Sequence, residues 1–293
     1  MKDKDHLSTL AWLLFAGILF SAVGLIGTVT TLSPGAVSFG RSLVASGALA
    51  LLCLREPRAV WTGKLRGKTA IAALAQAGNW SFFFAAIQTG GMDVAILALF
   101  AYPVMTALVE PLLEKKAIRW VELAGGTLVL LGILTVTPEL KLSNSTFVGI
   151  LLGLISAVFL TVRNLLGKDL VPSLGAVRLN LWMCLLCIPI FFPFRLFEPV
   201  GLTFDEVWQI GTLAVLFTVI PQVIFFASLK KVSAAWASLV ISSQPVFSIL
   251  LKALIFGQAP DFKTIIGGCF IVGAVILVSS FPSRTLEPKT QEG

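Results

Sequence analysis

Apolar stretches of about 20 residues follow one another along almost the whole chain, and each is long enough to cross the ~30 Å hydrocarbon layer of a bilayer as a helix. The mean hydropathy is +0.94, and only 13% of the 293 residues are charged. Soluble domains carry roughly 25% charged residues. The sequence therefore predicts an all-α integral membrane protein, with no loop long enough to hold a soluble catalytic domain.

Proline, glycine and charged residues divide the apolar stretches into ten expected spans. These spans cover residues 8–29, 35–54, 69–89, 93–113, 119–137, 146–166, 174–195, 206–229, 233–256 and 262–281. We expect two five-helix repeats, residues 1–138 and residues 139–293, the second followed by a short polar tail.

The distribution of lysine and arginine predicts how the spans are oriented. With ten spans, both termini and the loops 55–68, 114–118, 167–173 and 230–232 lie on one side, and together with the flanking Arg119 they hold 15 of the 22 Lys and Arg residues. The opposite side holds 3. By the positive-inside rule both termini are cytoplasmic. The net charge of +7 thus reflects topology, and no nucleic-acid partner is expected.

Residues 95–126 reappear at 237–268, at a constant offset of 142 and with nine identities in 32 positions. Pro103 aligns with Pro245, and each proline is expected to break its helix and expose polar backbone near mid-span. Because the repeat unit has an odd number of spans, the two copies have opposite orientations in the membrane. Inverted copies can close one mouth while opening the other, which favours alternating access over an open pore.

In both halves, Pro-Val is followed by a short helical run, a loop and a Gly-Gly pair. This arrangement resembles the EamA-type members of the drug/metabolite transporter superfamily. Phe39-Gly40-Arg41 also resembles the phenylalanine-x-arginine of the family's second span. The resemblance implies ten spans, with spans one to four and six to nine enclosing a substrate cavity, and export of an amino acid or a similar small metabolite.

Glycines in the fifth and tenth spans predict close helix packing between the halves, because small residues let backbones approach each other. The predicted packing residues are Gly125, Gly126 and Gly132 in the first half and Gly267, Gly268 and Gly273 in the second.

Polar residues scattered through apolar helices predict a binding chamber, since Asn and Gln in lipid leave donors and acceptors unpaired. Interhelical hydrogen bonding is the alternative. Arg41 lies about 10 Å along its helix and would attract a carboxylate or phosphate, unless it is a structural arginine bonded to helix-end carbonyls. The candidate substrate-binding residues are Arg41, Asn79, Trp80, Tyr102, Asn180, Gln222, Ser243 and Gln244.

Glu110 is the one carboxylate well inside an expected span, and it is therefore the candidate for proton coupling. Pairing with Lys115 or Arg163 is the alternative. Arg163 and Arg178 are expected near the cytoplasmic ends of spans six and seven, where topology alone explains an arginine.

The expected function is alternating-access transport of a small zwitterionic or anionic metabolite across a bacterial inner membrane, because the expected cavity has arginine nearby and almost no carboxylate. Transport of lipophilic cations or drugs is an alternative, as is a non-transporting protein such as a lipid scramblase or an assembly partner. No clustered His/Asp/Glu or Ser-His set predicts an enzyme. We expect no cofactor and no metal, and a monomer or a dimer.

Overall fold

The computed structural model describes residues 2–24, 30, 32–54, 62–118, 120–136, 144–197, 203–241, 244–257 and 260–280. These residues fold into helices without a strand among them. The helices are α1 (Lys2–Ser21), α3 (Pro34–Cys53), α4 (Gly63–Gly90), α5 (Met92–Leu99), α6 (Tyr102–Leu113), α7 (Trp120–Val136), α8 (Ser145–Leu174), α9 (Ala176–Arg195), α10 (Phe204–Ala214), the π-helix η1 (Val215–Val219), α11 (Ile220–Ser228), α12 (Ala234–Ile241), α13 (Gln244–Phe256) and α14 (Phe262–Ser279).

Six helical stretches of the described chain are long and apolar enough to cross a membrane. They are Pro34–Cys53, Gly63–Gly90, Met92–Leu113, Ser145–Leu174, Ala176–Arg195 and Phe204–Ser228. Shorter apolar stretches, Leu7–Ser21, Leu123–Gly132 and Phe262–Ala274, lie in α1, α7 and α14. The all-α prediction is confirmed, and the number of ten spans stays a prediction.

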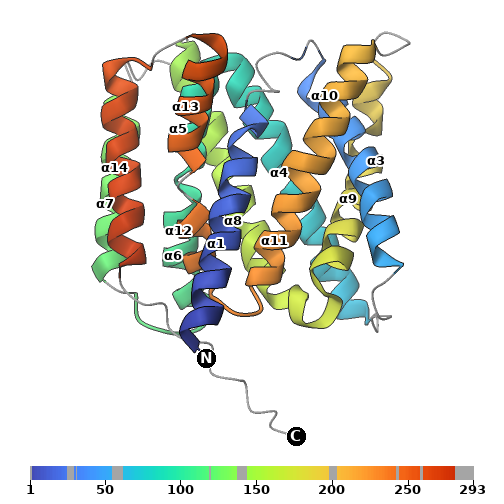
Figure 1. Ribbon diagram of the computed structural model, residues 1–293, viewed down its shortest axis with the longest axis horizontal. Helices are drawn as coiled ribbons and strands as arrows, with labels where there is room; N and C mark the ends of the chain where they lie inside the picture. Colours follow the sequence, from blue (N-terminus) through green and yellow to red (C-terminus); the bar gives the residue numbers. More distant parts are fainter. Residues whose placement is uncertain are drawn as a thin grey trace, which may run out of the picture.

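The helices stand side by side and run mainly along the vertical direction of Figure 1. The pair α7 and α14 forms one edge of the molecule, and α3 with α9 forms the opposite edge. Between these edges α4 packs along α8, and α1 packs against α11, α12 and α13. Helix α1 begins at the lower end of the molecule in this view.

One of the expected spans is built from two helices, and a second contains two described helical segments, on either side of residues 242–243. α5 ends at Leu99 and α6 begins at Tyr102, one residue before Pro103. α12 ends at Ile241 and α13 begins at Gln244, one residue before Pro245. Proline lacks an N–H to donate within a helix, which explains the interruption before Pro103. The break expected at Pro245 stays a prediction, because residues 242–243 lie outside the described residues.

α4 and α8 extend beyond their expected ends. The sequence predicted spans at 69–89 and 146–166, whereas the helices cover Gly63–Gly90 and Ser145–Leu174. The extensions contain Lys64, Arg66 and Lys168, and straight-chain basic residues are good helix formers even outside an apolar segment. Hydropathy therefore located the apolar part of each helix and missed its polar end.

Glycines allow the closest helix contacts. A Cβ on Gly149 of α8 would lie 2.6 Å from the Cα of Gly90 in α4, and one on Gly132 of α7 would lie 2.8 Å from the carbonyl oxygen of Gly267 in α14. No side chain fits at these two places. Gly273 differs from the prediction for the tenth span, because a Cβ there would meet nothing within 4 Å among the described residues.

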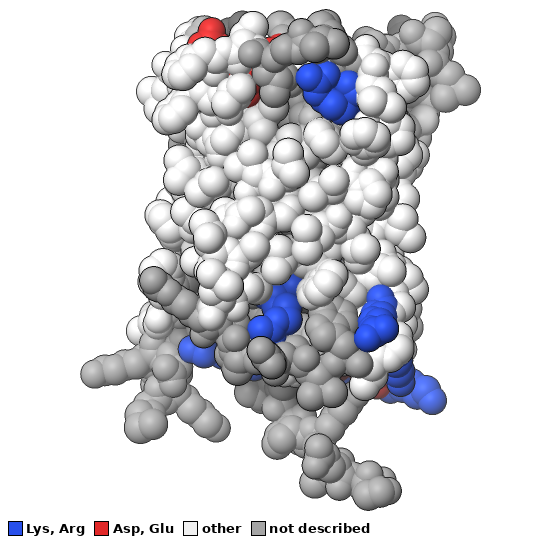
Figure 2. Space-filling view, turned by 90° about the vertical axis from the view of Figure 1, so that its right-hand side faces the viewer, with Lys and Arg blue, Asp and Glu red and all other residues white. Residues whose placement is uncertain are grey.

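Charged side chains lie at the two ends of the molecule, as Figure 2 shows for the side of α3 and α9. A broad band without lysine, arginine, aspartate or glutamate separates them, and most of the blue surface lies at the lower end. Large apolar side chains on the described helices point outward, among them Trp12, Leu43 and Leu74. An uncharged apolar belt between charged ends is the surface expected of a protein surrounded by lipid.

Candidate functional site

A cavity of about 60 Å³, enough for a few water molecules, lies between the neighbouring ends of α5 and α6 and those of α12 and α13. Residues at these helix ends line it: Leu99 and Tyr102 from α5 and α6, and Ile241 and Gln244 from α12 and α13. Its other polar and aromatic lining residues are Phe20, Arg41, Asn79, Trp80, Phe83, Arg163, Asn164, Gln222 and Phe225. The cavity therefore collects side chains from both halves of the sequence.

Arg41 of α3 is buried in the cavity wall, with 3% of its surface exposed. Its Nε donates to the Thr218 hydroxyl at 2.6 Å, and its guanidinium carbon lies 4.0 Å from the centroid of the Trp80 ring. Thr218 belongs to the π-helix η1 and donates its own hydroxyl proton to the carbonyl of Leu213. Among the described residues, no other side chain bonds the terminal guanidinium nitrogens of Arg41.

Arg163 of α8 is a second buried arginine that lines the cavity, although the sequence predicts it near a helix end. It lies 11 residues before Leu174, which is ~16 Å from the end of α8. Its Nη1 donates to the Gln76 side-chain oxygen at 3.1 Å, while its Nε and Nη2 donate to the Asn164 side-chain oxygen at 3.1 and 2.8 Å. All of these partners are neutral.

Neither arginine has a carboxylate partner among the described residues, and the cavity lining contains no aspartate or glutamate. A charge inside a membrane-spanning helix costs roughly 2.5–3.5 kcal/mol on insertion scales. A carboxylate about 4 Å from a guanidinium is attracted by ~4 kcal/mol at an effective dielectric constant near 20. The cavity is therefore electrostatically suited to an anionic group.

Other polar side chains of the wall are tied to neighbouring helices. Asn79 donates from its amide nitrogen to the Ser156 hydroxyl at 2.9 Å, joining α4 to α8. The Tyr102 hydroxyl donates to the carbonyl of Ser238 at 3.3 Å. Gln244 donates to the carbonyl of Phe20 at 3.1 Å, joining α13 to α1. The interhelical bonding expected as the alternative role is thus present alongside the cavity.

Six of the eight candidate substrate-binding residues line the cavity: Arg41, Asn79, Trp80, Tyr102, Gln222 and Gln244. Asn180 lies elsewhere, buried in α9, where its amide nitrogen donates to the carbonyl of Ala176 at 2.8 Å. Its side-chain oxygen has no hydrogen-bond partner among the described residues. Ser243 lies outside the described residues. Sequence reasoning missed Gln76, Asn164 and Thr218, which give no signal beyond being polar in an apolar helix.

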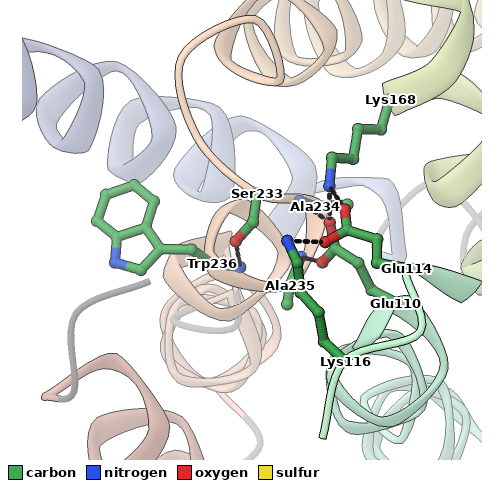
Figure 3. A network of polar contacts seen from close by, with 8 residues as sticks. All are labelled: Glu110, Glu114, Lys116, Lys168, Ser233, Ala234, Ala235 and Trp236. Carbon is green, nitrogen blue, oxygen red and sulfur yellow. Dashed lines mark hydrogen bonds and ion pairs between the residues drawn. The ribbon is translucent and has the colours of Figure 1, made fainter. Parts of the chain in front are cut away.

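Glu110 lies away from the cavity, at the start of α12 (Figure 3). Its carboxylate accepts from the backbone N–H groups of Ala234 and Ala235 at 3.2 and 2.8 Å, and it pairs with Lys168 of α8 at 2.5 Å. Lys168 also pairs with Glu114 at 2.5 Å. The sequence predicts Lys115 or Arg163 as the alternative partner of Glu110. The observed partner is Lys168, which lies in the part of α8 beyond the expected span.

Every backbone N–H of the first turn of α12 has a hydrogen-bond acceptor in this arrangement. The N–H of Trp236 donates to the Ser233 hydroxyl at 3.2 Å, and the N–H of Ala237 donates to the Ser233 carbonyl at 3.0 Å. A carboxylate at the positive end of a helix adds a favourable charge–dipole interaction. Lys116 pairs with Glu114 at 2.7 Å and completes what we call the Glu110 network: Glu110, Glu114, Lys116, Lys168 and the first turn of α12.

The sequence profile of the EamA-like transporter family matches residues 7–137 and 147–280. The chain belongs to the EamA-like transporter family. It is similar to an uncharacterized transporter, YxxF, of Bacillus subtilis (strain 168), with 21% identity over 287 residues that cover 94% of this chain and 91% of the relative. The family assigns the apolar helices to a multi-pass membrane protein and confirms the predicted resemblance.

A solved crystal structure superposes on this EamA-like chain with a TM-score of 0.70 and 19% sequence identity. The match covers 93% of this chain and 97% of the other. At this identity the likeness concerns the fold alone. The same helical architecture thus extends over nearly the whole of both proteins.

Proposed function

We propose that this EamA-like protein is an alternating-access transporter that carries an amino acid or a similar small zwitterionic or anionic metabolite through the cavity between α3, α4, α8 and α11. The supporting observation is a buried polar cavity lined by both sides of the interruption between α5 and α6 and by the facing ends of α12 and α13. Solute sites of many transporters lie at such interruptions, near the midplane and between two repeats. Export as the direction of transport rests on the family resemblance.

The ten-span inverted repeat is supported by the positions of the helices. α5 and α12 begin at the same offset of 142 that relates the repeated sequences, Met92 to Ala234. The two segments matched by the family profile lie on either side of residue 138, the proposed boundary between residues 1–138 and 139–293.

The packing of helices supports the same symmetry. Under the repeat, α4 corresponds to α10–α11 and α8 to α1, and the contact of α4 with α8 has its counterpart in the contact of α11 with α1. α5 and α6 both contact α8, and correspondingly α12 and α13 both contact α1. The pairs α3–α9 and α7–α14 each join a helix to its own counterpart. Two such related sets of contacts can exchange roles when the cavity changes sides.

The lower end of the molecule in Figure 1 is the proposed cytoplasmic side of a bacterial inner membrane. Lysine and arginine gather there, and the positive-inside rule then places both termini in the cytoplasm. A reporter enzyme that folds only in the cytoplasm, fused after the last residue, is expected to be active. Activity restricted to a periplasmic reporter would contradict this orientation.

The Glu110 network closes the cytoplasmic side in this proposal, because it joins α6 of the first half to α8 and α12 of the second. Opening that side separates these helices and breaks the network. A proton on Glu110 would remove its charge, weaken its pairing with Lys168 and release the start of α12. Lys168 and, beyond it, Glu114 and Lys116 are the charged groups that face this carboxylate. Proton coupling is therefore assigned to Glu110.

The Glu110→Gln variant tests this assignment, since glutamine resembles a permanently protonated glutamate. Exchange by the variant in liposomes is expected to lose most of its dependence on pH. Glu114→Gln, which leaves the Glu110 carboxylate and its bonds to α12 in place, is the matched control and is expected to keep that dependence. Unchanged pH dependence in Glu110→Gln would remove Glu110 from the coupling mechanism.

Transport itself is tested with purified protein in liposomes and a panel of labelled amino acids, organic acids, sugars and organic cations. Exchange of amino acids or small organic anions is the expected result. Exchange restricted to lipophilic cations would contradict the assigned solute class. The absence of flux for the whole panel would contradict transport and favour a scramblase or an assembly partner.

A further inference from the structure

We propose that the cavity binds a small organic anion with two negative charges, one held by Arg41 and the other by Arg163, rather than a zwitterion. The inference rests on the proposed transport function and specifies the solute class. It follows from the two arginines that line one cavity, the neutral partners of both, and the absence of a carboxylate from the lining residues. A ligand with two anionic groups balances both buried charges at once.

Arg41 is oriented for this role by its two contacts. The hydrogen bond from Nε to Thr218 and the stacking on Trp80 fix the plane of the guanidinium and leave its terminal nitrogens without a partner among the described residues. Two parallel N–H groups of a guanidinium match the two oxygens of a carboxylate or phosphate. The free edge of a preoriented arginine in a cavity wall is thus suited to an anionic group.

Arg163 contributes the second charge through a less open arrangement. Its N–H groups donate to the side-chain oxygens of Gln76 and Asn164. Both amides are neutral and leave the charge of Arg163 uncompensated. The guanidinium carbon also lies 5.2 Å from the centroid of the Phe226 ring. An anionic group can approach Arg163 from the cavity and replace one of these shared hydrogen bonds.

The ammonium group of a zwitterion has a poorer environment. The amide oxygens of Gln76 and Asn164 already accept from Arg163, and that of Gln222 accepts from Gln76 at 3.4 Å. An ammonium would also be repelled by both arginines in a medium of low dielectric constant. The aromatic lining residues Trp80, Phe83 and Phe225 instead suit a short carbon skeleton between the two anionic groups.

Binding to the purified full-length protein tests the charge requirement with matched ligands. Glutarate carries two carboxylates, its monoamide carries one, and glutamate adds an ammonium to the same skeleton; 3-phosphoglycerate, with one carboxylate and one phosphate, represents the phosphate source. Glutarate or 3-phosphoglycerate is expected to bind at least about tenfold more tightly than the monoamide and glutamate, the ratio set by one charged interaction. Equal affinity for the dicarboxylate and its monoamide would overturn the inference.

Variants of the two arginines then test which residues hold the two charges of the ligand. Arg41→Gln and Arg163→Gln are each expected to weaken binding of the dianion by about tenfold or more and to change binding of the monoamide less. Arg178→Gln removes an arginine that does not line the cavity and serves as the control. If Arg163→Gln does not fold, Arg163→Lys retains the charge but not the fork and is expected to give an intermediate loss. Unchanged dianion affinity in folded Arg41→Gln would contradict the assignment.

Exchange measurements separate this inference from the transport proposal. Exchange of zwitterions without exchange of dianions would uphold transport and overturn the dianion. Charge-dependent binding of dianions without exchange of any solute would uphold the site and overturn transport. Exchange of dicarboxylates alone or of phosphate esters alone would identify which source of the two charges the cavity takes.

Discussion

At the residue scale, one of the two contacts that orient Arg41 is a single hydroxyl, that of Thr218. Thr218 accepts from the Arg41 Nε at 2.6 Å within the π-helix η1. π-bulges are rare and often occur at functional sites, because they redirect side chains without ending the helix. The bulge places an acceptor where an α-helix would present a different side chain to Arg41.

Replacing this hydroxyl leaves the Arg41 Nε without its acceptor while keeping the shape of the side chain. Thr218→Val is expected to destabilise the protein by about 1–3 kcal/mol, the cost of leaving a buried charged donor unpaired. The unfolding temperature in detergent measures the effect. Thr127→Val on α7, whose hydroxyl donates only to its own helix and is exposed, is the control and is expected to change little. Equal effects of the two substitutions would contradict the role of Thr218.

The pKa of Glu114 predicts how the stability of the protein depends on pH. Burial raises the pKa of this carboxyl, but hydrogen bonds from Lys116 and Lys168 outweigh burial and hold the pKa below its ordinary value of 4.5. A carboxyl with a lowered folded pKa stabilises the fold above its unfolded pKa and loses that contribution as the pH falls through the folded value. Wild type should therefore be more stable than Glu114→Gln near neutral pH, and the difference should vanish in acid. A difference that grows in acid would contradict this sign.

At the element scale, the start of α12 depends on a side chain from another helix. Glu110 accepts two of its first N–H groups and pairs with Lys168, so Glu110→Gln is expected to cost about 1–3 kcal/mol. Thermal unfolding and hydrogen exchange of α12 measure the loss. Glu114→Gln is expected to have the smaller effect, since Glu114 is more exposed. Equal protection of α12 in wild type and Glu110→Gln would show that other groups define this helix end.

The contact of α4 with α8 depends on the absence of side chains at Gly90 and Gly149. Gly149→Ala would place a Cβ 2.6 Å from a backbone carbon, and overpacking of this kind costs about 1–3 kcal/mol. Gly47→Ala on α3 is the control: nothing lies within 4 Å of its added Cβ, and alanine in a helix is favoured by about 0.5–1 kcal/mol. Opposite changes in unfolding temperature are expected. A neutral Gly149→Ala would mean that α8 can move away without cost.

The positions of most helices could be predicted from the sequence, because hydropathy and proline reflect the properties of a single segment of the chain. The interruption next to Pro103, and the apolar parts of α4 and α8, follow from single segments. The polar end of α8 was not predicted. Arg163 was therefore expected near a helix end, and Lys168 was expected in a loop. The π-helix and the partners of Arg41 depend on packing between distant segments, which residue spacing does not encode.

At the scale of the whole molecule, one cavity lies between helices of both halves of the sequence, and its two arginines give it a positive charge. In the proposed mechanism the two halves are inverted copies, and the Glu110 network closes one side of the cavity. Breaking this network would then open the cavity on that side of the membrane. Solute exchange requires both parts, the site and the moving halves.

The most direct measurement is exchange of a labelled small anion by liposomes that contain wild type, Arg41→Gln or Arg178→Gln. Wild type and Arg178→Gln are expected to exchange the anion against unlabelled internal anion at similar initial rates. Arg41→Gln is expected to exchange at least about tenfold more slowly at low solute concentration, because affinity is lost. No exchange by folded wild type, or equal rates for wild type and Arg41→Gln, would contradict transport through this cavity.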